Sequence, residues 1–170
     1  FALVLYNLGR TLWVGRPLPL PARFVVAGLA SVAVAATLGL TFTYVLGNVT
    51  SASPLIEVTA AGLPLHVVAG IGGWLTFTAM GVSYRLLAMF MLAPEEKRRS
   101  SLVALWGGIV VLLLAIVGGC VAIFLGRDPA PVLAIAALLA VPVLALYGFD
   151  VLHLYQRRKR RRPVVRRAVR

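Results

Sequence analysis

The chain contains 170 residues, of which 61% are hydrophobic and 13% are charged, and its formal net charge is +12 at pH 7. Soluble globular domains contain about 45–50% apolar and about 25% charged residues, so this composition excludes an ordinary soluble domain. The apolar residues form runs long enough to cross about 30 Å of hydrocarbon, which takes about 20 residues in a helix. The sequence therefore predicts an all-α fold, a polytopic bundle of transmembrane helices.

An apolar segment over residues 1–14 opens the chain and is too short to cross a bilayer. We expect it to be the second half of a helix whose first half is missing. The sequence would then be a piece of a longer polypeptide, or one shortened at its front. No secretory signal is expected, because no basic segment precedes a short apolar core with a small-residue cleavage site.

Four full spans follow, and their apolar runs are continuous rather than alternating, which favours helices over the strands of a membrane barrel. The spans are predicted over residues 24–46, 63–92, 102–125 and 132–155. Pro142 lies inside the last span and predicts a kink there. We expect residues 1–156 to form one transmembrane bundle, followed by a basic tail over residues 157–170.

Fifteen of the 17 basic residues fall on one side of the membrane when the four spans are threaded in turn, with Arg127 on the other side and Arg85 within a span. Three arginines precede the first span, three basic residues lie between the second and the third, and nine follow the fourth. By the positive-inside rule this side is cytoplasmic, which predicts a bacterial inner-membrane protein with the 157–170 tail in the cytoplasm. The tail is expected to contact anionic lipid headgroups, and this explains the net charge without a nucleic-acid partner.

A histidine and several glycines share one face of the second span. At about 100° per residue, Gly70, Gly73, Phe77 and Gly81 lie on the same side of the helix as His66. Small residues at this spacing allow the close approach of another helix or of a planar macrocycle. His66 therefore has two interpretations: it bonds a carbonyl at the membrane surface while the glycines serve helix packing, or its neutral imidazole ligates haem iron.

The segment HVVAGIGGWLTFTAMGVSYRLLAMFMLAPEE resembles the second helix of the haem–copper oxidase subunit I superfamily and its shorter membrane relatives. The residues that carry the resemblance are His66, Gly81, Leu87, Phe90, Ala93, Pro94 and Glu95. In that superfamily this histidine is an axial ligand of the low-spin haem. The resemblance thus implies a haem-binding protein in electron transfer or redox-complex assembly, with His66 as the ligand and the glycine face as a haem or helix contact.

The chain departs from that superfamily outside residues 66–95. The histidines of the copper site and the second haem histidine are missing, and the one other histidine, His153, lies at the opposite end of the fourth span. A bilayer core of about 30 Å separates it from His66, so the two cannot ligate one iron. The second ligand would come from residues beyond this chain, from another subunit or from a methionine. No complete catalytic site is predicted.

Three further ionisable residues lie within or near the spans. Arg85 either extends to the headgroups or forms an ion pair inside the bundle with Asp150. Asp150 and His153 are spaced to touch on one helix face as a local pair, and a proton-transfer role is the alternative. The lone Cys120 is expected to be a small packing residue.

A second hypothesis needs no cofactor. The chain would be an accessory or structural transmembrane subunit of a larger respiratory or photosynthetic complex, with its glycines in helix–helix contacts. Its partners would be other transmembrane subunits or missing helices of the same chain. Absorbance beyond that of aromatic residues would separate the two hypotheses.

Overall fold

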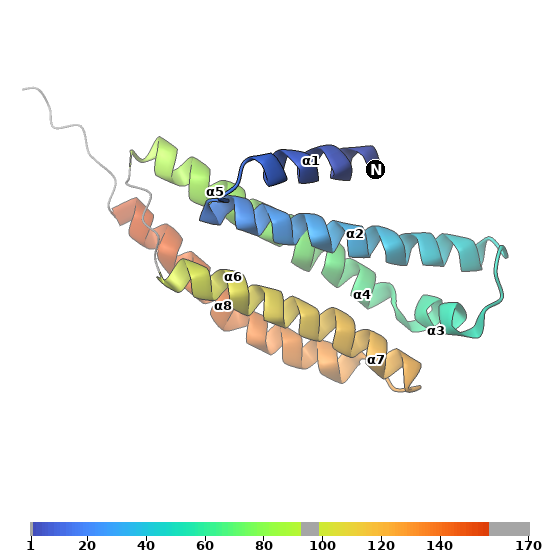
Figure 1. Ribbon diagram of the computed structural model, residues 1–170. Coiled ribbons are helices and arrows are strands. Elements are labelled where there is room, and N and C mark those ends of the chain that lie inside the picture. The colour runs from blue at the N-terminus through green and yellow to red at the C-terminus, as the bar shows by residue number, and fades with distance from the viewer. Residues whose placement is uncertain (1, 93–98, 157–170) are drawn as a thin grey trace, which may run out of the picture.

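The computed structural model describes residues 2–92 and 99–156, and within these ranges the chain is all-α (Figure 1). Four helices are long and apolar enough to cross a membrane. They span Leu20–Leu46, Leu63–Phe90, Arg99–Phe124 and Ala130–Gln156. The predicted fold class is therefore confirmed. The Ala93–Glu95 turn and the 157–170 tail lie outside the described residues.

The second and third long helices each contain a stretch with i→i+5 hydrogen bonding. The helices and π-helical segments are α2 (Leu20–Leu46), α4 (Leu63–Val67), η1 (Val68–Leu75), α5 (Thr76–Phe90), α6 (Arg99–Leu113), η2 (Leu114–Gly118), α7 (Gly119–Phe124) and α8 (Ala130–Gln156). The Ile71 carbonyl in η1 accepts a hydrogen bond from the backbone N–H of Thr76 and another, of 2.8 Å, from the Thr76 hydroxyl. Segments of this type are frequent at functional sites, and η1 begins two residues after His66.

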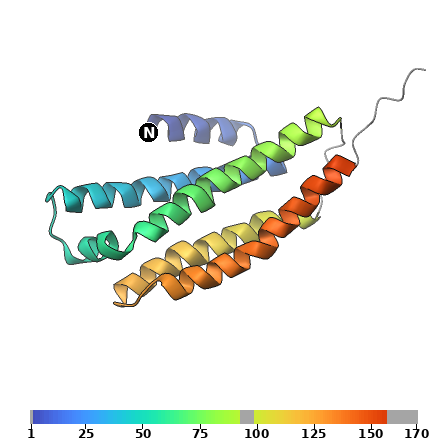
Figure 2. The same ribbon diagram turned by 180° about the vertical axis from the view of Figure 1, so that it is seen from behind.

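The helix ends lie close to the predicted spans, with local reasons for the differences. The first span begins at Leu20 rather than at residue 24, because Pro21 sits in the first turn of α2, where a missing N–H costs nothing. The fourth helix runs through Pro142 without a break. Figures 1 and 2 both show α8 bending near its middle, where a proline weakens the helix.

Two shorter helices accompany the spans. Helix α1 (Ala2–Val14) has no buried residue and lies alongside α2 in both views. At 1.5 Å per residue it is about 20 Å long, too short to cross the hydrocarbon core. Helix α3 (Ser53–Ala61) lies between the first two spans, where the sequence analysis expected only a loop. Pro54 in its first turn and Gly62 at its end mark its limits.

The bundle consists of two helix pairs, α2 with α4–α5 and α6–α7 with α8 (Figures 1 and 2). In the first pair the backbones approach closely at glycines. A Cβ atom on Gly73 would lie 2.5 Å from Cβ of Ser31, and one on Gly81 would lie 2.6 Å from the carbonyl oxygen of Pro21. In the second pair α8 stays largely exposed, and only Ala136 and Asp150 of its residues are buried.

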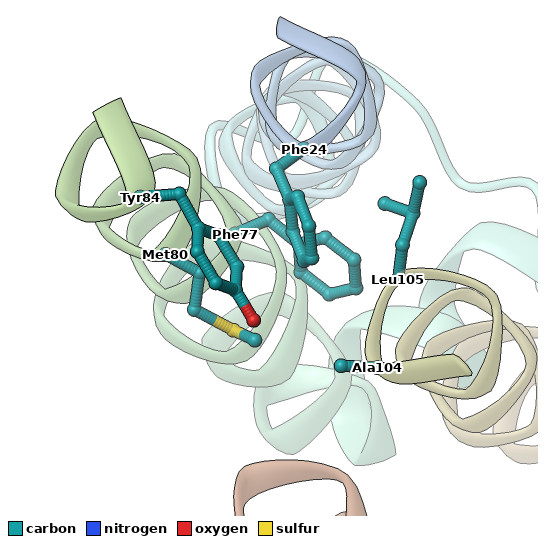
Figure 3. Packing of buried hydrophobic residues seen from close by; sticks show 6 residues of the cluster. All are labelled: Phe24, Phe77, Met80, Tyr84, Ala104 and Leu105. Atoms are coloured by element: carbon teal, nitrogen blue, oxygen red, sulfur yellow. The ribbon is translucent and has the colours of Figure 1, made fainter. Parts of the chain in front are cut away.

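An aromatic cluster joins the two pairs near the end of the bundle where α2 and α6 begin (Figure 3). The buried residues are Phe24 of α2, Phe77, Met80 and Tyr84 of α5, and Ala104 and Leu105 of α6. The Phe24 ring lies 6.0 Å from that of Phe77 and 5.5 Å from that of Tyr84, centroid to centroid. This cluster packs α5 against α2 and α6, and so fixes the depth at which the polar residues of α5 lie.

Candidate functional site

His66 projects from α4 toward α2. Its Nδ1 lies 2.9 Å from the backbone carbonyl oxygen of Ala35, and its ring lies 5.7 Å from that of Phe42. Gly39 makes room for the imidazole, because a Cβ atom there would lie 3.2 Å from Cε1 of the histidine. The ring is half-buried. The imidazole is therefore held against protein on one side.

The bond to Ala35 determines which imidazole nitrogen carries the proton. A carbonyl oxygen only accepts, so Nδ1 of His66 donates, and in the neutral ring Nε2 then bears the free lone pair. Nε2 has no hydrogen-bond partner among the described residues. Histidines that bind metals are commonly oriented in this way, with the second nitrogen bonded to a backbone carbonyl. The lone pair of His66 Nε2 is thus directed away from the Ala35 bond and is available for a further interaction.

The structure brings the other residues of the predicted face together but surrounds them unequally. Gly73 and Gly81 are covered by α2, and Phe77 belongs to the aromatic cluster. Gly70, one turn after His66, has nothing within 4 Å of the position that a Cβ atom would occupy. Helix packing therefore accounts for Gly73 and Gly81, and Gly70 is the open position beside the histidine.

A second polar site lies at the opposite end of the bundle, around Asp150. This carboxylate is 1% exposed. Ser100 donates a hydrogen bond of 2.6 Å to Oδ1, and Ser101 and Tyr84 donate bonds of 2.7 and 3.0 Å to Oδ2. The donors come from α5 and α6, while the carboxylate comes from α8. Asp150 thus fastens three helices together in a low-dielectric environment, where a polar group without a partner would be costly.

The first turn of α6 explains why the serines reach the carboxylate. The helix begins at Arg99, so Ser100 and Ser101 lie where backbone N–H groups are unpaired and the helix dipole is positive. An acidic side chain is favourable at such a position. Beside it, the hydroxyl groups of Ser83 and Tyr147 form a further hydrogen bond between α5 and α8.

The ring of His153 does not face Asp150, and the pairing of Arg85 with Asp150 stays a prediction. The ring of His153 stacks on Phe149 at 6.4 Å, and its buried Nε2 has no hydrogen-bond partner within residues 2–92 and 99–156. Arg85 is exposed and lines a surface groove with Pro19 and Pro21. The sequence analysis missed Tyr84, Ser100 and Ser101. A detectable signal was the pair of serines opening the third span at the depth of Asp150.

Potential metal ligands are dispersed over the described residues. No three His, Cys, Asp or Glu side chains gather there in a group that could hold a metal ion. Cys120 is a free thiol packed beside the buried cluster of Leu38, Val58, Leu65 and Ile123. His66 therefore offers one isolated imidazole nitrogen and is not part of a metal site built from several of the described side chains.

Comparisons of the chain with protein-family models, with curated proteins and with solved structures find no match. The resemblance of residues 66–95 to the haem–copper oxidase subunit I superfamily therefore stays a prediction. The fold itself establishes a multi-pass membrane protein in contact with the lipid bilayer.

Proposed function

We propose that this chain is a membrane haem-binding protein in which Nε2 of His66 supplies one axial ligand to the iron. The supporting observation is the hydrogen bond from Nδ1 to the Ala35 carbonyl, which leaves Nε2 with a free lone pair. The bound haem would serve electron transfer or the assembly of a redox complex in a bacterial inner membrane. The basic end of the bundle would face the cytoplasm.

The residues around His66 fit one side of a planar group. The Ala35 carbonyl fixes the plane of the imidazole and increases the electron density on Nε2, and the open position at Gly70 leaves space beside the helix. When bound, the haem supplies one-electron redox chemistry. The second axial ligand would come from another subunit or from helices beyond this chain, because His153 lies at the opposite end of the bundle.

The test is haem binding by the purified chain in detergent, with haem supplied during expression. The wild-type chain should give a reduced-minus-oxidised difference spectrum, and His66→Ala should lose it. The matched control is His153→Ala, which removes the other histidine of the chain and should keep the spectrum. Absence of haem from the wild-type chain, or retention by folded His66→Ala, would refute the proposal.

A second candidate function is that of a cofactor-free accessory subunit, and the exposure of α8 favours it. Large apolar residues such as Ile135, Leu138 and Val141 are exposed along this helix. A transmembrane helix with so little of its own chain around it is suited to contact another subunit or missing helices of the same polypeptide. Cysteine crosslinking from Leu138 to a co-purifying membrane protein, with no absorbance beyond that of aromatic residues, would favour this function over haem binding.

A further inference from the structure

A groove runs along the surface of the bundle between α2 and α6–η2. Its volume is about 460 Å³, and its lining is apolar except for Arg23 and Ser31. The Ser31 hydroxyl donates to the Ala27 carbonyl within its own helix. The groove therefore has one charged group, the guanidinium of Arg23, and otherwise presents mainly carbon to its occupant.

The length of the groove matches one leaflet of a bilayer. It extends along α2 from Arg23 to Val34 and along η2 to Val117. At 1.5 Å per residue the α2 wall is about 17 Å long, about half of a 30 Å hydrocarbon core. Both α2 and α6 begin at the basic end, so the groove reaches from that surface to the middle of the membrane. These are the dimensions of a single phospholipid acyl chain.

The charge at the mouth of the groove favours an anionic headgroup. Nε of Arg23 donates to the Leu18 carbonyl over 3.2 Å, which holds the guanidinium at the mouth. Its remaining N–H donors have no partner among the described residues. Asp150 is the acid at this end within those residues, and it is buried and bonded to hydroxyl groups. A phosphate at the mouth would therefore meet the arginine donors, and no exposed carboxylate of the described residues at this end competes for them.

We propose that this groove is a binding site for a phospholipid with an anionic headgroup. One acyl chain lies between α2 and α6, and the phosphate is bound by Arg23. Basic pockets between transmembrane helices bind anionic headgroups by the same chemistry. The site is independent of haem binding at His66, which lies at the other end of the bundle.

Trp106 lines the groove and reports on its occupant. We would replace Trp13 and Trp74 with phenylalanine and reconstitute the chain in phosphatidylcholine vesicles. Brominated acyl chains, which quench tryptophan on contact, would then be carried on either phosphatidylglycerol or phosphatidylcholine. We expect the anionic lipid to bind about fivefold more strongly at low salt, as one arginine near the membrane surface provides. The preference should fall as salt is raised.

Two substitutions test the two parts of the site. Arg23→Gln should abolish the preference for the anionic lipid, because the arginine that binds the phosphate is gone. The matched control is Arg85→Gln, which removes an arginine at the same end but in a different groove and should leave the preference unchanged. Ala30→Phe should fill the groove and reduce quenching by both lipids. Far-UV circular dichroism verifies that each variant is folded.

Three results would overturn the proposal. Equal quenching by the two lipids in the starting protein would mean ordinary surrounding lipid without selectivity. A preference that survives in Arg23→Gln would place the headgroup elsewhere. If both brominated lipids quenched Trp106 much less than their share of the vesicle lipid predicts, lipid would be kept away from the groove. A protein segment, such as a second copy of the chain, would then cover it.

Discussion

The two polar sites of this bundle lie at opposite ends, and their hydrogen-bonding capacity is used in opposite ways. Asp150 receives three hydrogen bonds from hydroxyl groups on two other helices and is 1% exposed. His66 makes one bond to the backbone of one helix and is half-buried, and its second nitrogen has no partner in the described part of the chain. A saturated polar group stabilises helix association, whereas an unsaturated one is available to a ligand.

This difference predicts opposite results for the two alanine substitutions. His66→Ala should remove haem while costing little stability, because a single interhelical hydrogen bond in a membrane contributes about 0.6 kcal/mol. Asp150→Ala should leave haem bound and should markedly lower the free energy of unfolding. If both substitutions affected stability and haem equally, the two sites would not differ in role, and the comparison would fail.

The largest loss of stability is expected for Asp150→Ala. The substitution removes three hydrogen bonds and leaves the hydroxyl groups of Tyr84, Ser100 and Ser101 buried without that acceptor. At about 0.6 kcal/mol for an average interhelical bond in a membrane and about 1.5 kcal/mol for a bond to a charged group, the loss of three bonds should lower the free energy of unfolding by about 2–4.5 kcal/mol. Denaturant titration in detergent micelles, followed by circular dichroism, measures this change.

The control for this substitution is Glu57→Ala, which removes an exposed carboxylate from α3 and should change the free energy of unfolding by less than about 0.5 kcal/mol. Asp150→Asn keeps the shape of the side chain, but its amide N–H groups face hydroxyl groups that already donate. Its loss of stability should therefore lie between those of Asp150→Ala and Glu57→Ala. An Asp150→Ala chain as stable as the Glu57→Ala chain would show that the cluster does not fasten α5, α6 and α8.

The spans could be predicted from sequence because their signal is local. Continuous apolar runs and the prolines and glycines between them define α2 and α8 without any knowledge of their neighbours. Helix α3 was missed, since its nine residues are too few for a hydrophobic pattern to decide against a loop. Pro54 and Gly62 signal its ends, but such residues are equally common in turns.

The sites were less predictable because their partners come from other helices. The spacing of Asp150 and His153 indicates only which residues meet on one helix face, whereas Tyr84 and Ser100 lie on neighbouring helices. A carbonyl partner for His66 was one of the two interpretations of the sequence, but that this carbonyl belongs to Ala35 depends on how α2 and α4 pack. Likewise, the glycine face of the second span is visible in the sequence, but the covering of Gly73 by α2 depends on how the helices pack.

A smaller loss of stability is expected from substitutions at the glycines. Gly73, which is packed against α2, should be sensitive, whereas Gly70, the open position beside His66, should not. Gly73→Ala adds a methyl group 2.5 Å from Cβ of Ser31, so α2 and η1 must move apart. Overpacking of this kind should lower the free energy of unfolding by about 1–2 kcal/mol. Gly70→Ala is the matched control, because a methyl group there meets nothing within 4 Å and favours the helix.

The same glycine pair tests the haem proposal at the open position. Thermal unfolding of the two variants should give a lower midpoint for Gly73→Ala than for Gly70→Ala. A bulkier Gly70→Leu should leave stability near that of Gly70→Ala but weaken haem binding, since its side chain occupies the space beside His66. Equal stability of Gly73→Ala and Gly70→Ala would contradict the packing of Gly73 against Ser31.

The smallest effect is expected for Tyr147→Phe, at the edge of the Asp150 site. The substitution removes the hydroxyl that bonds to Ser83 but keeps the ring that lies edge-on against Tyr84 at 5.5 Å. Ser83 retains its bond of 2.9 Å to the Met80 carbonyl, so no donor is left buried without an acceptor. The free energy of unfolding should fall by about 0.6 kcal/mol.

The comparison with Tyr84→Phe shows whether this second link belongs to the same fastening as the carboxylate. Tyr84→Phe removes a donor to Asp150 itself and should cost more than Tyr147→Phe, about 1–1.5 kcal/mol, because a bond to a charged group is stronger. If the two links act as one unit, the double variant should lose less stability than the sum of the single losses, since their rings and helices are in contact. Strict additivity would instead show that the Ser83–Tyr147 bond and the hydrogen bonds to Asp150 stabilise the bundle independently.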